Sequence, residues 1–114
     1  TRTIEQCDPA VHDRYETLKA FMEALGDDVS VSVLKYYIAF KRLRNFACVY
    51  FVPTRGEIGV WVKVDPDKVE LEDGFTHDVR GIGHYGTGDL GITIRNDEDL
   101  EKAKPLILRS YDAV

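Results

Sequence analysis

The chain has 114 residues, a formal net charge of −5 and a composition typical of soluble globular proteins. This length is enough for one domain with a buried core and too short for two. No apolar run approaches the length of a membrane span, and no signal-peptide pattern opens the chain. The two cysteines form no C-x-x-C pair and no cluster with histidine, which argues against a disulfide framework or a zinc site and fits a reducing cytoplasm.

The first predicted element is a helix over residues 9–25. Asp8-Pro9 is typical of an N-cap followed by proline at the first helical position, and Gly26 is expected to be the C-cap. Apolar side chains recur at helical spacing at Val11, Tyr15, Leu18, Met22 and Leu25. The chain begins at Thr1 rather than methionine, so we expect residues 1–8 to be a flexible tail or linker from a longer chain and residues 9–114 to form one domain.

The central part of the chain has the two-residue period of β-strands. Val29, Val31 and Val33 alternate with serines, and further strands are predicted at 36–42, 46–52 and 57–64. Short turns connect them, which predicts an antiparallel meander. In the fourth strand Ile58, Val60, Val62 and Val64 share one face, so we expect one face of the sheet to be buried under helices and the other to be partly open.

The C-terminal part is predicted to complete the sheet and add a second helix. Residues 65–78 contain six carboxylates and one lysine and are expected to be an acidic loop. Short strands are predicted at 79–82 and 91–95, and Asn96 is expected to cap a final helix that Pro105 kinks or restarts. The fold class is therefore predicted as α+β, a two-layer sandwich in which an antiparallel sheet of five or six strands carries the N- and C-terminal helices on one face.

The segment from Val29 to Gly56 contains no acidic residue and holds half of the aromatic residues of the chain. Its basic residues are Lys35, Lys41, Arg42, Arg44 and Arg55. A period of two places Tyr36, Ile38 and Phe40 in the core and Tyr37 and Lys41 on the other face, which Trp61 would share. Stacking combined with charge on that face could hold a base or a phosphate. The alternative is a partly exposed sheet face with ordinary solubilising lysines.

A glycine-rich stretch over 81–91 formally matches the G-x-G-x-x-G fingerprint from Gly81 to Gly86. A dinucleotide site needs a helix after that motif, and a β-type sequence follows here instead. Two interpretations remain: a tight β connection with bulges, or a nest of backbone amides that holds an anion. In the second case the side-chain partners would be Arg80, His84 and Tyr85.

The remaining candidates for chemistry are weaker. His77, Asp78, His84 and Asp89 could be combined into a metal site, but their spacing matches no standard zinc pattern. A general base formed by His84 with Asp89 is the basis of one alternative, a small enzyme. We expect no catalytic residue, no metal and no cofactor in this domain.

Several runs of sequence resemble one uncharacterised prokaryotic family, a domain of unknown function labelled "predicted transport protein". The runs are residues 25–29, 34–41, 45–48, 62–67, 78–80, 82–90 and 97–107, and the likeness extends from about Tyr15 to Tyr111. The resemblance implies a domain that commonly lies C-terminal to a restriction-nuclease-like domain, which would explain the missing initiator methionine. It implies no activity.

We therefore expect a noncatalytic binding module of a nucleic-acid-processing, nuclease-associated protein. It would engage nucleic acid or a phosphate-bearing ligand, with Lys41 and Arg80 converging beside the glycine turn to form one electropositive pocket. The expected ligand-binding residues are Lys35, Tyr37, Lys41, Trp61, Arg80, His84, Tyr85, Gly86 and Gly88. A protein-interaction or dimerisation domain that uses the open sheet face is the remaining alternative, and a homodimer is compatible with either.

Overall fold

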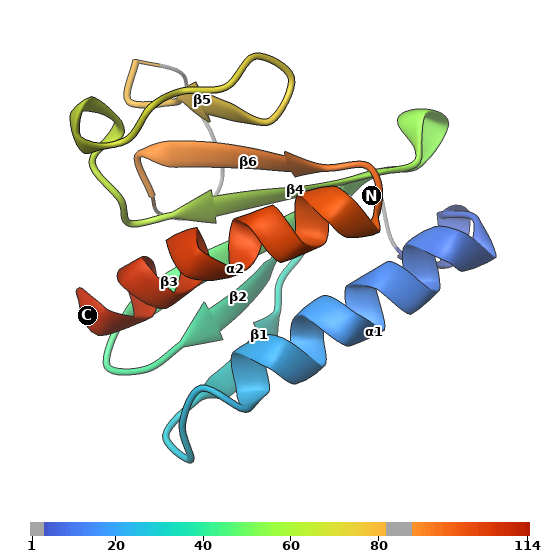
Figure 1. The fold of residues 1–114 in the computed structure, drawn as a ribbon. Helices are drawn as coiled ribbons and strands as arrows, with labels where there is room; N and C mark the ends of the chain where they lie inside the picture. Colours follow the sequence, from blue (N-terminus) through green and yellow to red (C-terminus); the bar gives the residue numbers. More distant parts are fainter. Residues whose placement is uncertain (1–3, 82–87) are drawn as a thin grey trace.

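Two α-helices cover one face of a six-stranded antiparallel sheet in the computed structural model, which describes residues 4–81 and 88–114 (Figure 1). This arrangement confirms the predicted two-layer α+β fold. The helices are α1 (Pro9–Glu23) and α2 (Asp97–Asp112), and three short 3-10 helices are η1 (Ile4–Gln6), η2 (Pro53–Arg55) and η3 (Pro66–Lys68). The strands are β1 (Ser30–Val33), β2 (Ile38–Lys41), β3 (Asn45–Val52), β4 (Glu57–Val62), β5 (Thr76–Asp78) and β6 (Leu90–Ile94), in the spatial order β1-β2-β3-β4-β6-β5.

Helix α1 forms where the apolar spacing predicted it. Asp8 is the extended N-cap residue and Pro9 opens the helix, while the buried face consists of Val11, Tyr15, Leu18 and Met22. The predicted end at Gly26 is wrong, because the helix stops at Glu23 with Ala24 as its C-cap. Gly26 instead leaves room for another side chain, since a Cβ atom there would lie 2.2 Å from the Tyr111 hydroxyl oxygen.

Helix α2 begins at the predicted cap and runs through its proline. The Asn96 side chain accepts a hydrogen bond of 2.8 Å from the Asp99 backbone N–H. The predicted restart at Pro105 does not occur, because one helix extends from Asp97 to Asp112. Pro105 cannot donate to the Glu101 carbonyl, and both residues are exposed, so water can satisfy that carbonyl.

The two faces of the sheet bury different sets of side chains. Toward the helices, strand β4 contributes Ile58, Val60 and Val62 to the main core, as the predicted alternation required. The opposite face carries a smaller buried cluster of Cys48, Trp61 and Val79, against which Tyr37 and Tyr50 pack. The face away from the helices is therefore an apolar and aromatic surface in its own right.

Two expectations about the strands are wrong in detail. Strand β2 begins at Ile38, so Tyr36 precedes the strand and is 44% exposed instead of lying in the core. Residues 79–81 form no strand, and Ile82 lies outside the described residues.

The fifth strand comes earlier in the chain, inside the segment that was expected to be an acidic loop. Thr76 begins β5 opposite Ile92 of β6. Its hydroxyl accepts a hydrogen bond of 2.8 Å from the Glu72 backbone N–H, which closes the turn before the strand. Phe75 is buried in the main core beside it.

Candidate functional site

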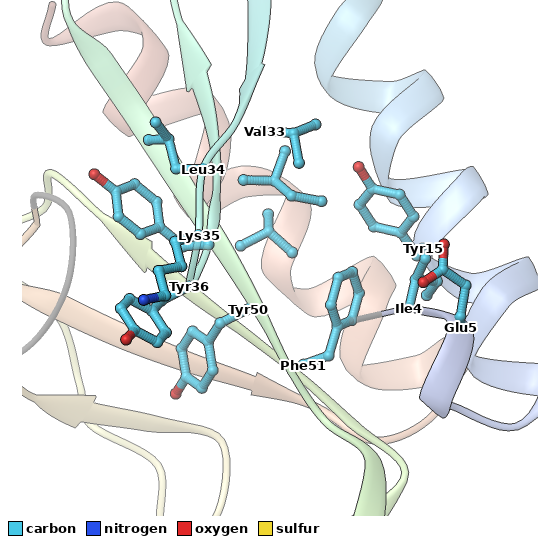
Figure 2. A pocket seen from close by; sticks show the side chains of 12 residues that line it. Ile4, Glu5, Tyr15, Val33, Leu34, Lys35, Tyr36, Tyr50 and Phe51 are labelled. Carbon is cyan, nitrogen blue, oxygen red and sulfur yellow. The ribbon is translucent and has the colours of Figure 1, made fainter. Parts of the chain in front are cut away.

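A groove of about 290 Å³ opens at the end of the sheet where β1 turns into β2 (Figure 2). Its walls come from four places in the chain: η1, α1, the β1–β2 connection and the C-terminal half of β3. The lining residues are Ile4, Glu5, Tyr15, Val33, Leu34, Lys35, Tyr36, Tyr37, Ile38, Val49, Tyr50 and Phe51. Most of these side chains are apolar or aromatic, as in typical sites for small organic ligands.

The groove extends around the strand ends. Tyr50 and Phe51 are neighbours on β3 and therefore point to opposite faces of the sheet. Figure 2 shows Phe51 on the side of Tyr15 and Ile4, and Tyr50 on the other side with Tyr36. The site is thus open to the helix-free face as well as to the gap beside α1.

The Tyr50 ring can lie flat against strand β4 because the residue opposite it, Gly59, has no side chain. A Cβ atom at Gly59, directly opposite Tyr50, would lie 2.0 Å from its ring. The Tyr50 ring also packs against Trp61, with the ring centroids 4.6 Å apart and the planes inclined by 33°. Burial and the nearby Glu57 carboxylate raise the pKa of Tyr50. Its hydroxyl is therefore a neutral hydrogen-bonding group at neutral pH.

Apolar side chains are exposed at the rim of the groove. Val33 is 79% exposed, Leu34 46% and Tyr36 44%. Three residues at one connection between strands thus place large apolar surface in solvent, which is the usual sign of a binding surface.

Two lysines of the expected site are free to meet an anion. Lys35 lies at the groove, with its Nζ atom 5.2 Å from the centre of the Tyr36 ring, and Lys41 is exposed at the far end of β2. Within residues 4–81 and 88–114, neither lysine forms an ion pair with a carboxylate. The segment from Lys35 to Lys41 therefore keeps the positive charge that its sequence indicated.

Arg80 has a different environment. Its guanidinium group contacts Asp78 at 2.8 Å, Asp67 at 3.0 Å and Asp65 at 3.6 Å. The hydrogen bond from Arg80 lowers the pKa of Asp67 and of Asp78, so these carboxylates are charged at neutral pH. Arg80 joins the loop after β4 to the end of β5, and its charge is balanced there.

Lys41 and Arg80 do not share a pocket. Lys41 ends β2 and Arg80 follows β5, and strands β3, β4 and β6 lie between them. Because adjacent strands are about 4.8 Å apart, four steps across the sheet separate the two positions by roughly 19 Å. The expected convergence of these two cations beside the glycine turn is therefore not found.

The structure places the other expected residues as follows. Tyr37 packs against the cluster beneath the helix-free face, and Trp61 belongs to that cluster with 7% of its surface exposed. Trp61 can thus support a bound ring from below but offers little surface for stacking. His84, Tyr85 and Gly86 lie outside the described residues.

Gly88 shows that the glycine-rich stretch does require glycine at one place. It has a φ of +134°, and a Cβ atom there would lie 2.9 Å from the backbone nitrogen and oxygen of Val62. The neighbouring Asp89 N–H donates to the Val62 carbonyl at 3.1 Å. Close approach of the chain to β4 explains this glycine without an anion.

Sequence reasoning missed one wall of the groove. Ile4, Glu5 and Tyr15 reach it from η1 and α1, and they come close to Val33 and Phe51 only through the fold. Burial, with the nearby carboxylates of Glu16 and Glu23, raises the pKa of Tyr15 to about 12. The one available signal was the apolar pair Val33-Leu34 at the end of a strand whose earlier residues alternate with serine.

The contacts of Arg80 predict how stability depends on pH. The pKa values of Asp67 and Asp78 are lowered in the folded state, so their contribution to stability is present above the ordinary carboxyl pKa and is lost as the pH falls through the lowered values. Arg80→Gln is expected to lower the midpoint of thermal unfolding by several degrees at pH 7 and by less at pH 3. Arg55→Gln, at an exposed arginine in η2, is the control. Equal losses at both pH values for Arg80→Gln would contradict this role.

Comparisons with known proteins place the chain in a family without assigning an activity. An uncharacterized protein of Haemophilus influenzae (strain ATCC 51907 / DSM 11121 / KW20 / Rd) is 29% identical over 97 residues, which cover 85% of this chain and 32% of that protein. The chain thus spans about a third of the length of this relative. No solved structure matches. Within the described residues, no helix has the combination of length and apolar character needed to cross a membrane. The model of the family described as "Domain of unknown function (DUF5655)" matches residues 3–114, nearly the whole chain, and the protein therefore belongs to that family.

Proposed function

We propose that this domain is a noncatalytic binding module that engages a phosphate-bearing ligand, with nucleic acid as the leading candidate. The observation that supports this proposal is the segment from Lys35 to Lys41. It carries a lysine at each end, neither paired with a carboxylate among the described residues, and tyrosines between them. Phosphate oxygens would contact the lysines, and a base or another flat ring would lie against the tyrosines.

Stacking would supply a large part of the affinity. Tyr36 is 44% exposed at the groove, and Tyr37 and Tyr50 are half-buried beside it. A base stacked on an aromatic side chain contributes about 1–3 kcal/mol in proteins that bind single strands without sequence preference. Stacking requires single-stranded nucleic acid, because the bases of a duplex are not accessible to the tyrosine rings.

The distribution of charge favours binding of a polyanion at one edge of the sheet. The basic segment lies at the β1–β2 edge of the sheet, while the acidic residues 65–78 include β5 at the opposite edge. A polyanion would be repelled from the acidic edge and attracted to the basic one, even though the net charge of the chain is −5.

The proposal extends to the protein that contains this domain. The relative from Haemophilus influenzae is about three times as long as the matched region. We infer that the domain serves as an accessory module beside a nuclease-like domain in a longer cytoplasmic chain, where it would hold nucleic acid near the catalytic domain. Transport is not proposed, because the binding surface described above requires no membrane.

Oligonucleotide binding tests the proposal. The unaltered domain should bind a fluorescently labelled single strand at low salt, with an affinity that falls steeply as salt is added, because phosphate contacts release counterions. The double variant Lys35→Ala/Lys41→Ala should bind roughly tenfold more weakly or worse, and its log–log salt dependence should be shallower by about 1.4, since each phosphate contact on a single strand contributes about 0.7. Fluorescence anisotropy at several salt concentrations measures both quantities.

The control variant removes the same number of positive charges at positions outside the basic segment. Lys19 on α1 and Lys68 on η3 are lysines outside the basic segment, and Lys19→Ala/Lys68→Ala should retain binding close to that of the unaltered domain. The proposal fails if the unaltered domain does not bind at low salt, or if both double variants lose affinity equally.

A further inference from the structure

Three cationic residues are placed at the end of the sheet opposite the groove. Lys41 ends β2 and pairs with Asn45, the residue that follows Arg44 in the β2–β3 turn. Lys63 directly follows β4, whose end lies beside the start of β3. Three neighbouring strands thus bring these cations to one end of the sheet.

The charges of these three residues are not balanced by ion pairs in the described part of the chain. Arg42, the fourth cation of this region, is different. Its Nε atom donates to Asp28 at 3.0 Å, and its guanidinium carbon lies 4.5 Å from the centre of the Tyr111 ring. Asp65, the first carboxylate after β4, contacts Arg80 at 3.6 Å. The three charges are therefore available to an external anion.

A hollow of about 280 Å³ lies between two of these cations and the end of α2, which is beside the β2–β3 turn in Figure 1. Its lining residues are Leu43, Arg44, Lys63, Ala113 and Val114. The exposed Asp112 of α2 does not line it. The C-terminal end of a helix carries the equivalent of about half a negative charge, which two full positive charges outweigh. Sites for whole small ligands have about 300–1,000 Å³, so this hollow suits a fragment such as a phosphate group with its sugar.

Lys63 connects the hollow with the helix-free face of the sheet. Val62 and Val64 both belong to the main core, so the Lys63 side chain between them is directed to the opposite face. Trp61 lies on that face, with the Tyr50 ring packed against it. The aromatic surface thus extends from the groove at Tyr50 toward the cations at the other end.

We propose that the hollow at Arg44 and Lys63 holds a phosphate group of a single strand whose bases contact the tyrosines of the groove, an inference that rests on the proposed function. Tyr50 and Asn45 are five residues apart on β3, or roughly 17 Å at about 3.4 Å per residue. Stacked nucleotides are also spaced by about 3.4 Å along one strand. The ligand is then a strand of about five nucleotides that crosses the helix-free face.

Removal of the two charges at the hollow tests this assignment. Arg44→Ala/Lys63→Ala should bind a labelled hexathymidylate roughly fivefold more weakly or worse. The log–log salt dependence should be shallower by about 0.7, the contribution of one phosphate contact on a single strand. Thermal unfolding should show that the variant is folded, because the hydrogen bonds from Arg42 N–H to the Arg44 carbonyl and from Lys63 N–H to Ser110 use backbone atoms that alanine retains.

The outcomes separate this inference from the proposed function. Lys19→Ala/Lys68→Ala again controls for the loss of two charges. If Arg44→Ala/Lys63→Ala binds as tightly as this control while Lys35→Ala/Lys41→Ala is weakened, the hollow holds no phosphate and the groove remains the binding site. If the unaltered domain binds no hexathymidylate at low salt, both proposals fail.

Spin labels at either end of the hexathymidylate test the path across the sheet. A label at one end should broaden the amide signals of Leu43 and Lys63, and a label at the other end should broaden those of Lys35 and Tyr36. Broadening of the same group of signals by both labels, or no broadening at Leu43 and Lys63 with either label, would overturn the inference.

Discussion

Ser110→Ala is expected to lower the free energy of unfolding by about 2–4 kcal/mol, because it leaves one buried and one partly buried backbone group without partners at about 1–3 kcal/mol each. The Ser110 hydroxyl is fully buried on α2 between two strand ends. It donates to the Phe46 carbonyl at 2.5 Å and accepts from the Lys63 N–H at 2.7 Å. Alanine can do neither, and the change in side-chain volume is too small to admit a new partner from the protein.

Urea denaturation measures this loss. An unchanged slope of the unfolding free energy against urea concentration would show that the two-state transition is preserved. Ser32→Ala is the control, since Ser32 is exposed on β1 and its hydroxyl has access to water. We expect that variant to lie within about 0.5 kcal/mol of the unaltered domain. A loss for Ser110→Ala that is equally small would contradict the bridging role of the hydroxyl.

Gly88→Ala is the second substitution with a large expected effect. The φ of +134° strains any residue with a Cβ atom, at about 1–3 kcal/mol. The new Cβ atom would also lie 2.9 Å from backbone atoms of Val62 and 3.0 Å from the Trp61 carbonyl carbon. These atoms belong to β4, which pairs on both sides and cannot move without disturbing β3 or β6. We expect a total loss of about 2–4 kcal/mol.

Gly81→Ala is the matched control for that substitution. Among the described residues, a Cβ atom at Gly81 meets nothing within 4 Å, and its φ lies outside the range that favours glycine. Alanine there should be neutral or slightly stabilising, because it restricts the unfolded chain. Similar losses for the two variants in urea denaturation would show that the contact with Val62 is not the cause.

Much of the fold could be predicted because local patterns and tertiary packing agree. The alternation of Ile58, Val60 and Val62 identified the helix-facing side of β4, and the apolar spacing of α1 identified its buried face. Asn96 identified the start of α2 through a cap that depends only on neighbouring residues. In each case the residues that determine the structure are close together in the sequence.

The predictions from sequence are wrong where residues far apart in the chain determine the local structure. Gly26 does not cap α1, and its space is used by Tyr111 from the other end of the chain. Strand β5 forms at Thr76 because β6 pairs there, although the surrounding carboxylates are typical of a loop. Arg80 was expected to serve a ligand, yet carboxylates from the loop after β4 surround it. No pattern of spacing carries this information.

The candidate site was predictable in part for the same reason. The charge and aromatic content of residues 35–41 are properties of one segment, and the structure keeps Lys35 and Lys41 free of ion pairs among the described residues. The groove beside Lys35 depends on Tyr15 and Phe51, which reach it through packing. A site assembled from several elements requires the fold before it can be recognised.

The most direct test of the account is a map of the binding surface by NMR. Backbone amide signals of the isotopically labelled domain should be recorded while a short single-stranded oligonucleotide is added at low salt. We predict that the largest shifts occur at residues 35–41 and at Tyr50, with little change at Arg80 and in residues 65–78. Shifts concentrated around Arg80, or no shifts at saturating oligonucleotide, would contradict the central claim that the β1–β2 end of the sheet is the binding site.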